Sequence, residues 1–129
     1  DSENGGPLTD GDYTEAAQSS DRPSLPMDIV LSWPPPVSFN QVQMYCWYAR
    51  NQAPTQVSFQ VSRDGQTWQD IVSPLTLEWN HADTTLEKQT ISFDQVQDIS
   101  FLRMRVHDAN LKWKHFAINE LEIYDMQAQ

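Results

Sequence analysis

Three polar segments of the sequence, residues 47–52, 79–81 and 110–115, each combine a tryptophan with side chains that can hydrogen-bond to a ligand. A sugar presents apolar C–H faces together with many hydroxyl groups, so its receptors pair an aromatic ring with a few fixed polar side chains. The segments therefore predict a ligand-binding site whose residue types are compatible with a sugar. The candidate ligand-binding residues are Trp47, Tyr48, Arg50, Asn51, Trp79, His81, Asn110 and Trp113.

These residues also allow structural interpretations, which the sequence leaves open. The guanidinium of Arg50 can donate two hydrogen bonds to adjacent hydroxyls, but Arg50 could equally be a surface arginine beside a core tryptophan. Trp79 is flanked by an amide and an imidazole, which is unusual for a connecting loop. Its ring could instead cap the edge of the core.

A second candidate site lies near the start of the chain, where Asp10 and Asp12 flank Gly11. Calcium prefers oxygen ligands from carboxylates, carbonyls and hydroxyls, and a glycine permits the tight turn that such a loop requires. The segment predicts a calcium loop, although a solvated Asp-Gly turn has the same sequence.

The sequence offers little for catalysis, and we expect a protein that is not an enzyme. It contains neither a G-x-S-x-G nor an H-E-x-x-H motif, and the spacing of His81, His107 and His115 does not demand a metal. Cys46 is the only cysteine, which excludes an internal disulfide and a cysteine-based zinc site. We expect Cys46 to be a small buried hydrophobic residue.

The net charge is −10, from 8 basic and 18 acidic residues, and it restricts the possible partners. Nucleic acids and anionic membranes would be repelled, whereas neutral ligands and divalent cations would not. No apolar run approaches the roughly 20 residues that span a bilayer, so we expect no membrane insertion.

Apolar residues alternate with polar ones along much of the chain, which predicts strands with one buried face. Pro34, Pro35 and Pro36 are expected to end the first strand, because proline cannot donate to a strand ladder. Asp64-Gly65 predicts a hairpin turn. The apolar faces are Ile29, Leu31 and Trp33; Val42 and Met44; Val57, Phe59 and Val61; Ile91 and Phe93; Leu102, Met104 and Val106; and Leu121 and Ile123.

Short strands without a helical stripe predict an all-β antiparallel sandwich or barrel. The length of 129 residues fits a single domain over residues 1–129, with residues 1–7 loosely held. The sequence starts abruptly at Asp1 without a signal peptide, so we expect a module excised from a larger multidomain protein.

Three segments together resemble the discoidin, or coagulation-factor type C, superfamily of galactose-binding-like domains. They are Leu8-Thr9-Asp10-Gly11-Asp12, the S-x-D-G-x-x-W hairpin within 57–68, and the paired segments 101–106 and 117–124. The order and spacing of these segments match the pattern of the superfamily from about Leu8 to Tyr124. The chain is most similar to bacterial carbohydrate-binding modules of family thirty-two and its relatives.

This resemblance implies a jelly-roll β-sandwich of about eight strands. It also implies a structural calcium ion at Asp10, Asp12 and Glu120, with Thr14 one position earlier than the threonine of the family pattern. Arg50 matches an arginine of the family's binding site, and the family often takes an asparagine and an aromatic residue from the last loop, here Asn110 and Trp113.

The function implied by the resemblance is recognition of galactose, N-acetylgalactosamine or a related terminal sugar. The module would direct an attached glycoside hydrolase to glycans outside the cell or at its surface, in a secreted bacterial protein. A protein-binding or lipid-binding discoidin-like module and a structural spacer domain remain alternatives. Clustering of Arg50, Trp79 and Trp113 at one end of the sandwich would favour sugar binding over the spacer.

Overall fold

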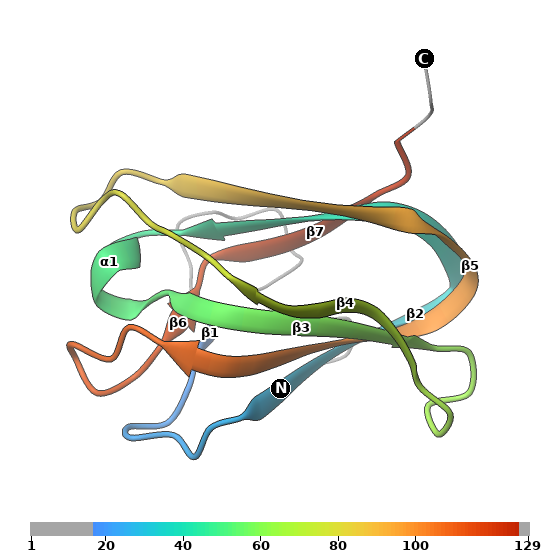
Figure 1. The fold of residues 1–129 in the computed structure, drawn as a ribbon, viewed down its shortest axis with the longest axis horizontal. Coiled ribbons are helices and arrows are strands. Elements are labelled where there is room, and N and C mark those ends of the chain that lie inside the picture. The colour runs from blue at the N-terminus through green and yellow to red at the C-terminus, as the bar shows by residue number, and fades with distance from the viewer. Residues whose placement is uncertain (1–16, 127–129) are drawn as a thin grey trace.

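The computed structural model describes residues 17–126, which form a two-layered β-sandwich (Figure 1). The order of the elements confirms the all-β fold that the alternating pattern predicted. The elements are β1 (Ala17–Gln18), β2 (Met27–Cys46), α1 (Ala49–Gln52), β3 (Pro54–Ser62), β4 (Gln69–Thr76), β5 (Glu87–Ala109), β6 (Ala117–Ile118) and β7 (Glu120–Tyr124).

Two long strands, β2 and β5, contribute to both layers. They are antiparallel from Met27 opposite Val106 to Cys46 opposite Glu87, with register shifts between Ser32 and Gln41. The first half of β2 and the second half of β5 form one layer with β3 and β4, and the other halves form the second layer with β7. Figure 1 shows both strands curving around the same end of the sandwich. The described residues therefore contain seven strands rather than about eight.

The prediction that the three prolines end the first strand is wrong, because β2 continues through them. The ladder with β5 nevertheless has no pairs between Ser32 and Val37. Proline lacks the N–H group that a ladder requires but tolerates an extended backbone. The prolines thus interrupt the pairing where the chain passes from one layer to the other, and the chain stays extended.

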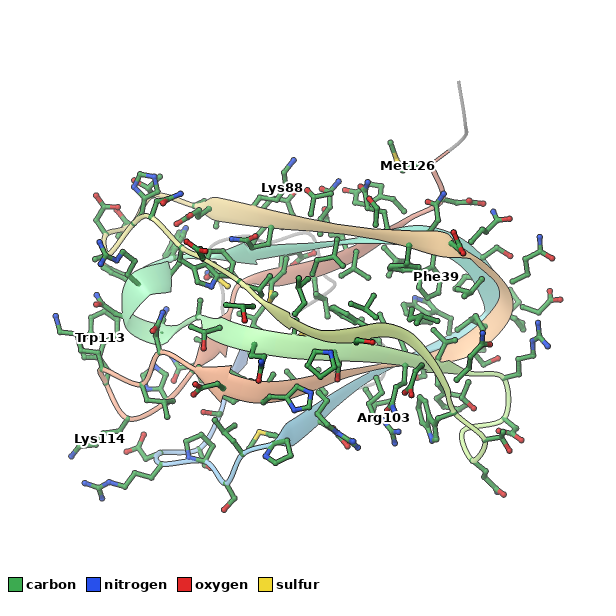
Figure 2. The ribbon with its side chains drawn as sticks, viewed as in Figure 1. Phe39, Lys88, Arg103, Trp113, Lys114 and Met126 are labelled. Atoms are coloured by element: carbon green, nitrogen blue, oxygen red, sulfur yellow. The ribbon has the colours of Figure 1, made fainter. Side chains whose placement is uncertain are left out.

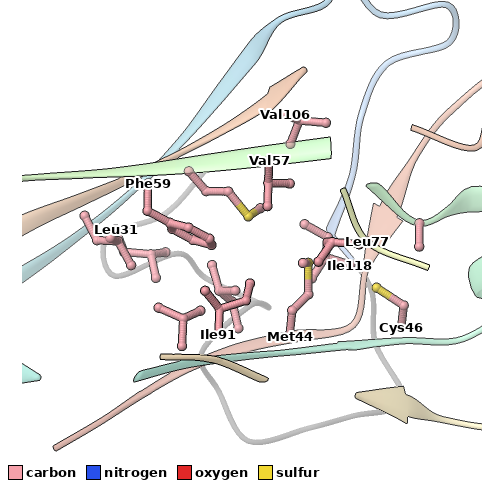
Figure 3. Close-up of a cluster of buried hydrophobic side chains, with 14 of the residues drawn as sticks. Leu31, Met44, Cys46, Val57, Phe59, Leu77, Ile91, Val106 and Ile118 are labelled. Atoms are coloured by element: carbon pink, nitrogen blue, oxygen red, sulfur yellow. The ribbon is translucent and has the colours of Figure 1, made fainter. Parts of the chain in front are cut away.

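The core lies between the two layers and includes most residues of the predicted apolar faces, whereas Ile29, Trp33, Phe93 and Ile123 pack against it partly buried (Figure 3). Phe39 and Phe59 are fully buried, and Cys46 is buried as expected. Trp33 is half-buried and packs on Phe39 with ring centroids 5.9 Å apart. Burial raises the pKa of the Cys46 thiol, because the charged thiolate would be desolvated.

The predicted hairpin turn joins β3 to β4. Gly65 has a φ of 79°, in the left-handed region that favours glycine, and a Cβ at this position would come within 3.1 Å of the Phe101 ring. The Oδ1 atom of Asp64 accepts hydrogen bonds from the backbone N–H groups of Gln66 and Thr67, both at 2.8 Å. The turn is therefore closed by its own side chain and backbone.

The first described strand, β1, pairs with β6 in a small second sheet. Ala17 of β1 lies opposite Ile118 of β6 in an antiparallel pair. The expectation for residues 1–7 falls outside the described residues. Within residues 17–126, no helix is long and apolar enough to cross a membrane.

Candidate ligand-binding site

The short helix α1 organises one end of the sandwich, at the left of Figure 1. The sequence showed no helical stripe, and α1 is a single turn, Ala49–Gln52. Tyr48 precedes it with a φ of 51°, which turns the chain sharply out of the β2 layer. The N–H of Gln52 then donates to the carbonyl of Tyr48 at 3.0 Å and closes the turn.

The α1 segment is attached to the loop that connects β4 to β5. The backbone N–H of Tyr48 donates to the carbonyl of Asp83 at 2.8 Å, and that of Arg50 donates to the carbonyl of His81 at 3.0 Å. The side-chain amide of Asn51 donates to a third carbonyl in the same loop, that of Ala82, at 3.1 Å. These bonds fix the second predicted segment beside the first.

The third predicted segment, between β5 and β6, is attached to the other side of α1. The backbone N–H of Asn110 donates to the carbonyl of Ala53 at 2.9 Å, and its side-chain amide donates to the carbonyl of Ala49 at 3.0 Å. The N–H of Lys112 donates to the carbonyl of Asn51 at 3.0 Å. All three predicted segments therefore meet at this end, which we call the loop end (residues 47–53, 77–86 and 109–116).

An aromatic pair projects from the loop end. Trp113 is 41% exposed, and its ring meets the half-buried ring of Tyr48 with centroids 5.1 Å apart and an interplanar angle of 71°. Figure 2 shows Trp113 and Lys114 pointing away from the sandwich. Edge-to-face contact holds one ring against the other, so the pair forms an ordered apolar surface beside polar groups.

The exposed side chains of Arg50 and His81 belong to the same hydrogen-bonded unit as the aromatic pair. The Nδ1 atom of His81 lies 4.0 Å from a carboxylate oxygen of Asp83, with the two side chains 45% and 72% exposed. Asp83 accepts a hydrogen bond from the backbone N–H of Thr85, which holds the pKa of its carboxyl below the usual value. The loop end thus carries a cation, an imidazole, a carboxylate and two aromatic rings.

The other four predicted residues are buried or use their hydrogen-bonding groups within the fold. Trp79 is 8% exposed and its indole N–H donates to the carbonyl of Pro54 at 2.7 Å, so the core-edge interpretation fits better than the ligand platform. Trp47 is half-buried, and its backbone N–H donates to Oδ1 of Asn119. Asn51 is 8% exposed, and Asn110 uses its amide to hold α1. These four residues position the exposed groups.

The sequence does not indicate the role of Glu87, which fixes the backbone of the β4–β5 loop. Its carboxylate accepts hydrogen bonds from the backbone N–H of Asn80 at 2.8 Å and from that of His81 at 3.0 Å. Gln52 was also missed: its Nε2 donates to the carbonyl of Trp47 and its Oε1 lies 3.2 Å from Nε2 of His115. No local pattern marks either residue, because their partners lie on other elements or across a turn.

The predicted calcium ligands Asp10, Asp12 and Thr14 lie outside the described residues. Glu120 begins β7 opposite Tyr45 and is 1% exposed. Between residues 17 and 126 there is no group of three or more histidine, cysteine, aspartate or glutamate side chains placed to hold a metal ion. The metal prediction therefore depends on residues that precede the described part of the chain.

Comparison with known proteins assigns this sandwich to a family. The model of the F5/8 type C domain matches residues 4–121. The chain belongs to the F5/8 type C domain family. This confirms the resemblance inferred from the hairpin and from the closing strands. No curated protein matches the sequence.

Solved structures of F5/8 type C folds superpose over nearly the whole chain. Carbohydrate-binding module CBM32-1 of a family 31 glycoside hydrolase from Clostridium perfringens has a TM-score of 0.72 at 14% identity, covering 97% of this chain and 87% of the other. CpGH89CBM32-5 from Clostridium perfringens, solved in complex with GalNAc-β-1,3-galactose, has a TM-score of 0.72 at 17% identity, with coverages of 92% and 81%.

A third similar structure is the F5/8 type C domain of a protein from Bacteroides fragilis. Its TM-score is 0.71 at 13% identity, and the match covers 96% of this chain and 82% of the other. At sequence identities of 13–17%, the similarity to these three structures shows a shared fold and no more.

Proposed function

We propose that this F5/8 type C domain is a non-catalytic carbohydrate-binding module that recognises terminal galactose-type sugars at its loop end. The observation that carries the proposal is the pair of the exposed Trp113 ring and the half-buried Tyr48 ring, whose centroids are 5.1 Å apart, on the same hydrogen-bonded unit as Arg50 and His81. An apolar ring surface beside fixed donors and acceptors suits a sugar with one apolar face and several hydroxyls.

Each exposed group has a distinct role in this proposal. Trp113 provides the surface against which the C–H face of the sugar packs, and Tyr48 holds that ring in place. Arg50 donates hydrogen bonds to adjacent hydroxyls, and its backbone bond to the carbonyl of His81 fixes where its side chain begins. His81 and Asp83 supply a further donor and acceptor.

The similar structures support the sugar class. The names of two of them include carbohydrate-binding modules, and one was solved with a disaccharide of N-acetylgalactosamine and galactose. The chain itself is acidic, with a net charge of −10, which suits a neutral sugar better than an anionic glycan. We place the module outside the cell or at its surface, where it would direct an attached glycoside hydrolase to glycans.

The proposal includes a structural calcium ion held by Asp10, Asp12, Thr14 and Glu120. Glu120 begins β7 and is 1% exposed, and the resemblance to the family implies a calcium ligand at this position. The four side chains offer the hard oxygen ligands that calcium prefers. The ion would hold the early loop against β7 and take no part in sugar recognition.

A lipid-binding module is the second candidate, because Leu111 and Trp113 are 36% and 41% exposed and alternate with Lys112 and Lys114. Apolar side chains with basic neighbours can enter an anionic membrane surface. The strong net negative charge of the chain opposes this interpretation. Sugar binding is therefore the function that the loop end supports best.

The test is a glycan array followed by calorimetric titration of the best sugar against wild type and Arg50→Ala. We expect binding to terminal galactose-type sugars and its loss in Arg50→Ala with an unchanged circular dichroism spectrum. Lys88→Ala is the matched control, because it removes one exposed cation from β5, away from the loop end (Figure 2).

Three outcomes would contradict the proposal or part of it. No binding to any glycan at millimolar concentration would leave a spacer or a protein-binding domain. Binding to anionic vesicles in place of sugars would favour the lipid alternative. Sugar binding that survives Arg50→Ala would preserve the function and remove Arg50 from the site.

A further inference from the structure

Figure 1 shows the β3–β4 turn and the bend of β5 at the end of the sandwich opposite the loop end. Residues of these two segments line a groove. Its first part has a volume of about 390 Å³ and is lined by Trp68 and Arg63 among others. A second part of about 290 Å³ shares Arg63 and Gln69 with the first. A third part of about 190 Å³ shares Gln69 and Gln95 with the second. The three parts therefore adjoin one another, and we call them together the groove.

Side-chain amides line this groove, and two of them are held in fixed orientations. Nε2 of Gln95 donates to Asp125 at 2.7 Å, and Nε2 of Gln97 donates to Oε1 of Gln95 at 3.2 Å. The guanidinium of Arg63 donates to the carbonyl of Gln97 at 3.1 Å. A primary amide has two N–H groups and an oxygen with two lone pairs, so each amide retains hydrogen-bonding capacity. The groove offers several hydrogen-bond donors and acceptors.

An aromatic ring stands at one end of the groove. The guanidinium carbon of Arg103 lies 4.1 Å from the centroid of the Trp68 ring, and the Phe101 ring meets Trp68 at a centroid distance of 6.4 Å. The stacked guanidinium covers one face of the indole and restricts the orientation of the ring. Trp68 thereby forms a wall of the first part of the groove.

The charges that line the groove select for a neutral occupant. Asp64 lines the first part and Asp70 and Asp94 line the third, whereas Arg63 is the only cationic residue among the lining residues of the three parts. Carboxylates accept hydrogen bonds from hydroxyls but repel a polyanion. Amides, carboxylates and one ring along an extended surface match a chain of neutral sugars better than an apolar ligand.

We propose that this groove is a second carbohydrate site, which takes a neutral oligosaccharide along Trp68, Gln69, Gln95 and Gln97. It shares no residue with the loop end and would function whether or not the loop end binds a terminal sugar. A glycan chain would lie across the β3–β4 edge, with one sugar ring against Trp68 and its hydroxyls on the amides. Two sites at opposite ends would let one domain engage two chains.

The test is a nuclear magnetic resonance titration of the 129-residue chain carrying Arg50→Ala, with lacto-N-tetraose and cellotetraose as neutral probes and trigalacturonic acid as the anionic probe. We expect a neutral tetrasaccharide at millimolar concentration to shift the side-chain amide signals of Gln69 and Gln95 and the indole signal of Trp68. Substituting Gln69→Ala and Gln95→Ala together should weaken that binding about tenfold, because hydrogen bonds to the sugar are lost.

Gln18→Ala is the matched control, since it removes an exposed glutamine from β1 and should leave the affinity unchanged. If the double variant does not fold, the same titration is carried out with Gln69→Ala alone. The proposal is overturned by unmoved groove signals with both neutral probes, or by equal shifts with trigalacturonic acid. Because Arg50→Ala and wild type are titrated in parallel, a failure of the groove is distinguished from a failure at the loop end.

Discussion

The ring of Trp113 meets the ring of Tyr48 edge to face, with centroids 5.1 Å apart. The two residues are far apart in the sequence and come from different elements. Tyr48 precedes α1 in the left-handed conformation, and the loop that carries Trp113 is tied to α1 through Lys112 and Asn51. The aromatic surface of the loop end therefore depends on α1.

Replacing the exposed ring should weaken sugar binding with little effect on folding. Trp113→Ala removes a ring that is 41% exposed, so we expect a loss of affinity of about tenfold or more. The stability should fall by only about 0.5–1.5 kcal/mol, the worth of one aromatic pair. Calorimetry with the sugar and urea unfolding measure the two effects. Affinity equal to that of wild type would remove Trp113 from the site.

The buried tryptophan should behave in the opposite way. Trp79→Phe leaves the carbonyl of Pro54 without its 2.7 Å partner, so we expect the free energy of unfolding to fall by about 1–3 kcal/mol. The sugar affinity should stay within a factor of about two of wild type. Trp33→Phe is the control, because it shrinks another tryptophan next to the core. A large loss of affinity with unchanged stability would restore Trp79 as part of the platform.

Calcium should stabilise the domain through Glu120. We expect addition of a chelator to lower the Tm of wild type, because an ion that binds only the folded chain stabilises it by mass action. In Glu120→Gln the Tm should no longer respond to calcium, since a carboxylate ligand is lost. Differential scanning calorimetry with and without calcium measures this. The same Tm in chelator and in excess calcium would disprove the metal site in wild type.

Acid should weaken the β3–β4 turn through Asp64. Hydrogen bonds from the backbone N–H groups of Thr67 and Gln66 and from the hydroxyl of Ser62 hold the pKa of Asp64 below 3.8. Since the folded-state pKa is the lower one, this stabilisation is complete above about pH 3.8 and is lost as the pH falls through the folded value.

Asp64→Asn should therefore lose less stability than wild type between about pH 4 and pH 2. The amide oxygen can still accept hydrogen bonds but does not titrate there. Urea unfolding at a series of pH values gives both curves. Asp94→Asn on β5 is the matched control for the loss of one exposed carboxylate. Parallel curves for wild type and Asp64→Asn would assign the acid sensitivity to other groups.

The strand pattern was readable because a period of two places one face of each strand in the core. Val57, Phe59 and Val61 are each at most 1% exposed, as their alternation predicted. The Asp64-Gly65 turn was likewise a local signal, and Gly65 takes the positive φ that such a turn requires. The continuation of β2 through Pro34–Pro36 could not be predicted, because prolines commonly end a ladder and no local pattern shows that the unpaired chain stays extended between the two layers.

The candidate site could be predicted only in part, because the burial of each side chain depends on residues that are distant in the sequence. Polar aromatic loops were visible in the sequence, but Trp79 and Trp113 look alike there and differ fivefold in exposure, 8% against 41%. The fate of each ring is decided by what packs over it. Glu87 and Gln52 carried no local signal because their roles consist of contacts with backbone groups elsewhere in the fold.

The sequence by itself determined the fold class, the hairpin and the three segments that could bind a ligand, because these follow from local periodicity, turn chemistry and residue type. Only the tertiary structure decided which of those side chains face solvent and that α1 gathers all three segments at one end. It also revealed the groove along Trp68 and Gln95. Burial and long-range hydrogen bonds are properties of residues brought together by folding, and no short stretch of sequence encodes them.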